Sequence, residues 1–174
     1  MKTKKMILSG FFIAMGIIVP TIFHALNLAG PIFLPMHLPV ILGGFLLGPA
    51  YGAAIGFITP IICGFLTGMP PVMPTMPIMA LELCAYGFMA GFLYNKTNKI
   101  FISLVGSMIF GRIWAMVGAF ILSVSLAPQI SAIPYIIAAV TNGLPGILIQ
   151  FMVIPALVKF MTTNKETSKV LGVN

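Results

Sequence analysis

The sequence predicts an all-α integral membrane protein with six transmembrane helices in one bundle, the second of them short or kinked. Of the 174 residues, 60% are hydrophobic and 6% are charged, and the mean hydropathy is +1.14. A soluble domain of this length needs polar residues over its surface, whereas lipid can surround an apolar one. The basic residues also gather near the ends of apolar segments. We therefore expect a single membrane domain over residues 1–174.

Six apolar runs give the expected helices, because crossing a hydrocarbon core of about 30 Å takes about 20 apolar residues. The runs lie near residues 6–26, 37–48, 50–66, 77–94, 100–124 and 132–160. No clear cleavage site follows the first run, so we interpret it as an uncleaved helix rather than a signal peptide. The second is short even if it begins at Ile32, and Pro35 and Pro39 interrupt it. Lipid cannot satisfy a bare backbone, so this segment should lie against protein or a wet cavity.

Small residues recur at four-residue spacing, a pattern that lets helix backbones approach closely. The pairs are Gly10/Ala14, Gly44/Gly48, Gly52/Gly56, Gly64/Gly68 and Gly87/Gly91. We interpret most of them as packing contacts inside the bundle. The pair in the first helix leaves two alternatives open, internal packing and contact with a partner subunit.

The positions of the basic residues predict that both termini are cytoplasmic, because cytoplasmic loops carry an excess of Lys and Arg. With the N-terminus inside, the inner segments hold every basic residue except Arg112. These residues are Lys2, Lys4, Lys5, Lys96, Lys99, Lys159, Lys165 and Lys169. An even number of spans follows, and six fits the lengths better than four.

Glu82 and Arg112 are the two ionisable residues placed deep within predicted spans, where charge is costly and often functional. The other acidic residue, Glu166, is in a polar tail and is expected to be solvated. Glu82 lies 12 residues before Tyr94, and Arg112 lies 12 residues after Ile100. Both are therefore about 18 Å along their helices from the joint between the two spans. Two compatible interpretations are a buried ion pair and a pair of side chains that contact a substrate.

Four further side chains are candidates for substrate binding. Tyr86 lies one turn beyond the glutamate, and Asn142 has a compatible depth in the last span. Trp114 lies two residues from the arginine, either as a core residue or as a stacking surface for a planar ligand. His37 flanks an outer loop, where it either caps a helix or contacts the ligand.

The segment 68–77 is rich in Gly, Pro and Met, and it lies between the third and fourth expected helices. Met69, Pro70, Pro71 and Met73 belong to it. Such a segment resists regular structure, so it is either a simple turn or a lid folded over an outer cavity. The second, fourth and sixth helices would begin at this side and point their positive dipole ends toward it.

The residues argue against an enzyme. There is no phosphate-binding G-x-x-x-x-G-K-[ST] loop and no zinc-binding histidine motif. Without Asp, metal-dependent phosphotransfer loses its usual ligands. No catalytic residue, metal or cofactor is expected. The scattered basic residues also argue against nucleic acid as a partner.

Five stretches form a recognisable set, densest over residues 35–94. They are PMHLPV at 35–40, GFLLGPAYG at 44–52, GMPP at 68–71, MALE at 79–82 and YG at 86–87. Together they resemble the substrate-binding (S) component of energy-coupling factor (ECF) vitamin transporters. The chain length, the helix count and the charge pattern agree with this resemblance.

The resemblance implies a substrate-binding subunit of an ATP-driven importer in the bacterial plasma membrane. It would capture a vitamin or related micronutrient from the outer side, with pantothenate or a pyridoxine-like compound as the leading candidates. Its partners would be a membrane coupling subunit and two ATPases. Ser9, Gly10 and Ala14 match the positions that contact the coupling subunit in this family.

A different class of transporter remains as the alternative. Proton-coupled carriers use acids embedded in the membrane, so Glu82 could serve as the ion-coupling residue of a stand-alone secondary transporter or channel. Such proteins often carry inverted repeats, and no repeat is visible in this sequence.

Overall fold

The structure is a computed structural model that describes residues 2–26, 30–125 and 132–164. Within these ranges all regular secondary structure is helical, and turns and loops connect the helices. The helices are α1 (Lys2–Ala25), α2 (Gly30–Phe33), α3 (His37–Leu47), α4 (Pro49–Thr67), α5 (Thr75–Thr97), α6 (Ile100–Ser125) and α7 (Ala132–Thr163). The expected position of Glu166 in a solvated tail lies outside the described residues.

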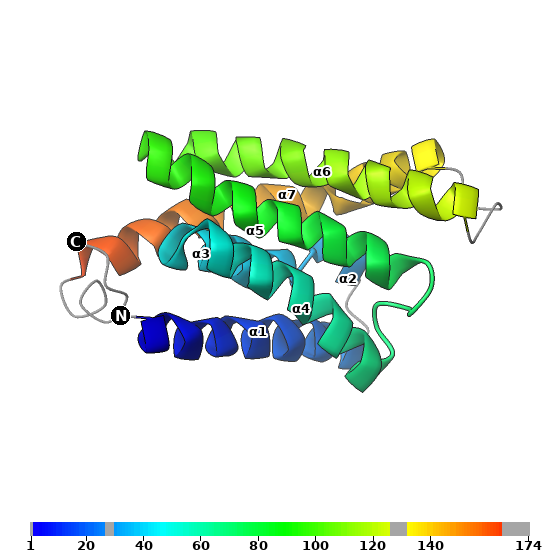
Figure 1. Cartoon of the computed structure of the whole chain (residues 1–174), viewed down its shortest axis with the longest axis horizontal. Helices are drawn as coiled ribbons and strands as arrows, with labels where there is room; N and C mark the ends of the chain where they lie inside the picture. The colour runs from blue at the N-terminus through cyan, green and yellow to red at the C-terminus, as the bar shows by residue number, and fades with distance from the viewer. Residues whose placement is uncertain (1, 27–29, 126–131, 165–174) are drawn as a thin grey trace.

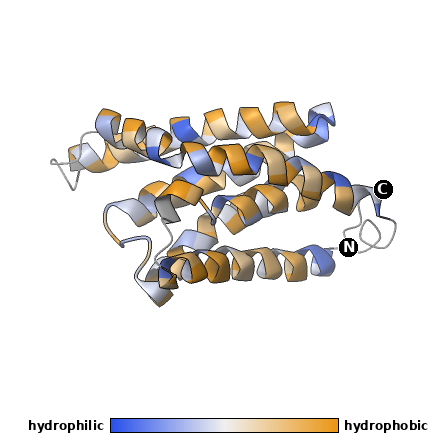
Figure 2. Cartoon of the chain, turned by 180° about the vertical axis from the view of Figure 1, so that it is seen from behind, coloured by the Kyte–Doolittle hydropathy of each residue, from blue (hydrophilic) through white to orange (hydrophobic). Residues whose placement is uncertain are grey.

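Five of these helices are long and apolar enough to cross a membrane, and α3 is a shorter apolar helix. Figure 2 shows hydrophobic residues along most of their length and hydrophilic residues mainly toward their ends. The predicted all-α membrane bundle with a short second helix is therefore confirmed. The chain is a multi-pass membrane protein.

The short helix α3 lies at the centre of the bundle. Its 11 residues span about 17 Å at 1.5 Å per residue, and every one except Leu38 is buried. It packs against α1, α4, α5 and α7. Protein rather than lipid surrounds this incomplete crossing, as the interruption by prolines led us to expect.

The helices α4 and α5 pack with their backbones in close contact. A Cβ atom on Gly87 would collide with the carbonyl oxygen of Gly52, and one on Gly56 would collide with that of Leu83. Gly44 of α3 makes the same kind of contact with the backbone at Gly87. These three glycines permit a separation that any larger residue would prevent.

Gly48 and Gly68 do not belong to this packing, contrary to the four-residue pattern. Their φ angles of 97° and 74° end α3 and α4 in backbone conformations that favour glycine. The pairs Gly44/Gly48 and Gly64/Gly68 therefore each consist of one glycine that packs against a neighbouring segment and one glycine that ends a helix.

The bundle has two distinct ends (Figure 1). The start of α1, the joint between α5 and α6 and the end of α7 lie together at one end. Among the described residues this end holds Lys2, Lys4, Lys5, Lys96, Lys99 and Lys159. The opposite end is formed by the end of α1, the loop between α4 and α5 and the end of α6.

Candidate functional site

A cavity of about 290 Å³ lies at the end opposite the lysines and extends to the middle of the bundle. Its polar side chains come from five of the helices and are His24, His37, Thr75, Glu82, Arg112 and Asn142. Its apolar wall consists of Pro20, Leu34, Pro35, Met36, Met69, Pro70, Pro71, Met79, Ala138 and Ala139. The volume is at the lower end of the range of about 300–1,000 Å³ that is typical of small-molecule pockets.

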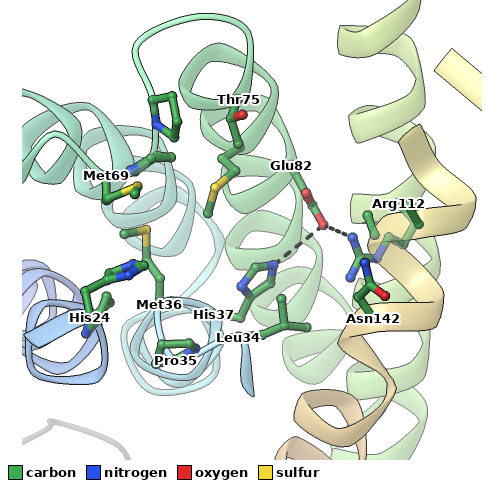
Figure 3. Close-up of a pocket in the computed structure, with 16 residues that line it drawn as sticks. His24, Leu34, Pro35, Met36, His37, Met69, Thr75, Glu82, Arg112 and Asn142 are labelled. Atoms are coloured by element: carbon green, nitrogen blue, oxygen red, sulfur yellow. Dashed lines mark ion pairs between the residues drawn. The ribbon is translucent and has the colours of Figure 1, made fainter. Parts of the chain in front are cut away.

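Glu82 of α5 connects two basic groups on different helices (Figure 3). Its Oε1 atom lies 2.8 Å from Nη1 of Arg112 on α6 and 3.6 Å from Nε2 of His37 at the start of α3. Glu82 is 4% exposed and His37 is 2% exposed. Removal of these groups from water strengthens their mutual attraction and makes any unpaired polar atom costly.

Several polar atoms at this contact lack a hydrogen-bond partner within the described part of the chain. They are Nδ1 and Nε2 of His37, Oε1 of Glu82, and Nε and Nη2 of Arg112. The distance of 2.8 Å brings the charges of Glu82 and Arg112 together, and 3.6 Å is too long for a hydrogen bond to His37, so the hydrogen-bonding capacity of these groups is not satisfied. Buried groups of this kind require an explanation, and an absent ligand is one.

The break between α2 and α3 places His37 at the cavity. Leu34 has a φ of 50°, which is unusual for a bulky residue and marks a strained position. The N–H of His37 donates to the carbonyl oxygen of Leu34 at 3.1 Å. The chain thus turns sharply before α3, and the residues of the turn line the cavity.

Tyr86 supports the site without lining it. Its ring packs edge-on against that of His37, with centroids 5.3 Å apart, and the residue is buried. Gly111 of α6 makes room for this ring, since a Cβ atom there would overlap it. The expectation that Tyr86 lies near the glutamate agrees with this position, although the tyrosine is not part of the cavity wall.

Met69, Pro70 and Pro71 form the part of the wall that the loop between α4 and α5 contributes. The hydroxyl of Thr67 donates to the carbonyl oxygen of Met69 at 3.1 Å, and the N–H of Met76 donates to that of Pro71 at 3.0 Å. Three of the four loop residues named from the sequence thus line the cavity. Met73 does not line it and is half exposed.

Trp114 is also separate from the cavity. It is 40% exposed on α6, and its ring packs edge-on against Phe110 with centroids 6.2 Å apart. Neither interpretation of this residue, as a core side chain or as a stacking surface in the site, matches its position. Two residues along a helix correspond to about 200° of rotation, so Trp114 and Arg112 face different sides.

Sequence reasoning did not identify several lining residues, of which His24 and the methionines Met36 and Met79 are the most distinctive. His24 is a polar residue at the outer end of an apolar helix, and that contrast was an available signal. The methionines gave none, because apolar residues in an apolar chain do not reveal whether they face lipid, core or cavity.

The residues matched to a coupling-subunit contact lie on α1 and do not line the cavity. Gly10 and Ala14 are exposed and Ser9 is half-buried. A Cβ atom on Gly10 would meet nothing within 4 Å. This face of α1 is therefore free of contacts with the rest of the described chain near Gly10.

No cluster of three or more His, Cys, Asp or Glu side chains suited to a metal ion occurs in the described ranges.

Comparison with curated proteins and with solved structures gave no significant match. The model of the family described as ECF transporter, substrate-specific component, matches residues 4–158, which is most of the chain. This chain therefore belongs to the family of substrate-specific components of ECF transporters.

Proposed function

We propose that this chain captures a vitamin or related micronutrient in the cavity and delivers it to an ECF coupling subunit and two ATPases. The observation that carries the proposal is the buried contact of Glu82, Arg112 and His37 at the cavity, with polar atoms left unpaired. A ligand that completes these hydrogen bonds would bind tightly, because unsatisfied buried groups are costly.

The direction of capture is from the outer side. The cavity and the described lysines occupy opposite ends of the bundle, and lysine-rich ends face the cytoplasm. This arrangement supports an outer position for the loop with Met69 and Pro70. The exposed face of α1 around Gly10 and Ala14 is available to a coupling subunit within the membrane.

The size of the cavity supports a compact ligand. About 290 Å³ suits a molecule such as pantothenate or a pyridoxine-like compound. The pairing of Glu82 with Arg112 also favours a binding subunit over the stand-alone transporter, because an ion-coupling carboxylate must exchange its cation, whereas Arg112 already occupies this one.

A thermal-shift measurement on the purified chain, with a panel of vitamins and precursors, tests the proposal. A ligand at a hundredfold excess over its Kd should stabilise the folded state by about 2.7 kcal/mol. Liposomes that contain the chain with its coupling subunit and ATPases should then take up the same compound only with ATP. Uptake by the chain alone, driven by an ion gradient, would contradict the proposal and support the secondary transporter.

A further inference from the structure

The formal charges that line the cavity cancel. With the histidines neutral, the lining residues carry one negative charge, on Glu82, and one positive charge, on Arg112, and the two are in contact at 2.8 Å. A ligand carboxylate bound to the remaining edge of Arg112 would bring a second negative charge into this space. A buried charge without its own partner is strongly unfavourable.

The start of α5 does not compensate for that charge. A helix N-terminus binds anions through its first free N–H groups, but here Pro74 is the N-cap and Pro77 is in the first turn, and proline has no N–H. The N–H of Met76 already donates to Pro71. At most the N–H of Thr75 is left for an anion.

The start of α3 is similarly restricted. Its N-cap is Met36, the N–H of His37 donates to the carbonyl oxygen of Leu34, and Pro39 has no N–H. The group of adjacent free donors that makes a helix N-terminus an anion site is therefore interrupted here as well.

Within the ranges that the structure describes, the unpaired atoms at the cavity are two donors of Arg112, one acceptor of Glu82 and the two ring nitrogens of His37, of which one donates and one accepts when the ring is neutral. Nε and Nη2 of Arg112 have no hydrogen-bond partner among the described residues, although the hydroxyl of Tyr86 lies near this guanidinium. Asn142 lies beside the same guanidinium in Figure 3, and its amide both donates and accepts. These groups call for ligand acceptors such as ring nitrogens, carbonyls or hydroxyls, which carry no full charge.

The rest of the wall suits a flat, unsaturated body. Met36 and Met69 lie on the side away from Arg112 in Figure 3, and Met79 also lines the cavity. Sulfur makes favourable contacts with the edges of aromatic rings. Prolines from three segments complete this wall. An aliphatic chain would fill the same space without that contribution.

We infer that the cavity selects a compact ring compound without net charge, held by acceptor atoms on Arg112 and Asn142 and by its ring against the methionines. The inference rests on the proposed function. Of the two leading candidates it selects the pyridoxine-like compound over pantothenate, whose carboxylate the cavity disfavours.

Pairs of compounds that differ in charge but not in framework test this inference on the purified full-length chain. The pairs are nicotinamide and nicotinate, pyridoxine and 4-pyridoxate, and pantothenol and pantothenate. In the pair that binds best, the neutral compound should have a Kd at least about tenfold lower than that of the carboxylate with the same framework. A carboxylate that binds better than its neutral partner overturns the inference but leaves the proposed function intact. If no compound of the pairs or of the vitamin panel binds, the proposed function fails as well.

Glu82→Gln provides the second test, because it removes the negative charge and leaves Arg112 unbalanced. The preference within each pair should then reverse toward the carboxylate. Thr75→Val is the matched control, since it removes a polar group of the cavity without changing its charge, and it should alter both affinities equally. An unchanged preference in Glu82→Gln overturns the inference. If that variant does not fold, the comparison in the unaltered chain decides.

Discussion

The contact between Glu82 and Arg112 joins α5 to α6, and the two side chains are only 6% and 15% exposed. We predict that Arg112→Gln lowers the free energy of unfolding by about 3–5 kcal/mol, because it leaves a buried carboxylate without its partner. Thermal or denaturant unfolding in detergent, without ligand, measures this loss.

The double variant Glu82→Gln/Arg112→Gln separates charge from packing. It removes both charges and keeps side chains of similar size, so most of the lost stability should return. If the double variant is as unstable as the single one, packing rather than charge holds these helices together.

The position of this pair was predictable, and the positions of other site residues were not. Glu82 and Arg112 lie at equal distances from a shared joint, which sets their depth, and their cost in lipid turns both inward. Trp114 has a similar depth to Arg112 but faces another side, so depth alone was insufficient. Met36 reaches the cavity because the chain turns at Leu34, and His24 reaches it because α1 packs against α3. No periodicity encodes either arrangement.

Among the helices, α4 and α5 depend on backbone contact. We predict that Gly87→Ala destabilises the protein by about 1–3 kcal/mol or more, because the added methyl group collides with the backbone at Gly52 and a helix backbone cannot move aside locally. Gly10→Ala is the control, since nothing lies within 4 Å of its Cβ position, and it should change stability by less than about 1 kcal/mol. Equal effects of the two substitutions would contradict the role of these glycines.

The loop between α4 and α5 provides a second matched comparison. Met69 and Met73 of this loop are similarly exposed, at 44% and 49%, but only Met69 lines the cavity. We predict that Met69→Ser weakens ligand binding by about 0.3–1.5 kcal/mol through loss of thioether contacts, mainly by faster dissociation. Met73→Ser should leave the dissociation rate unchanged. If both substitutions act alike, the loop does not contribute to the wall in the way proposed.

Hydropathy and length predicted the long helices and the shortness of α3, since both follow from the thickness of the bilayer. They did not predict α2, because a single turn of four residues has no periodicity to detect. They also could not separate packing glycines from turn glycines. Gly44 and Gly48 have the same spacing as Gly52 and Gly56, yet Gly48 ends α3.

The protein as a unit has chemically different ends, and its orientation in the membrane can be measured. We predict that a cysteine at Val72, in the loop near the cavity, reacts with a membrane-impermeant maleimide in intact cells. A cysteine at Asn95, near the lysines, should react only after permeabilisation. Both positions are exposed, and the native Cys63 and Cys84 are replaced by alanine in each variant. The opposite labelling pattern would invert the proposed direction of capture.

The depth of the charge pair also determines how capture responds to voltage. A molecule that reaches Arg112 from the outer side crosses roughly half of the membrane, and a full charge moved through the whole field gains or loses about 2.3 kcal/mol per 100 mV. An anion would therefore work against an inside-negative potential before any ATP is used. A ligand without net charge enters this neutral cavity unaffected, so the cell could load the subunit equally well whether its membrane is energised or depolarised.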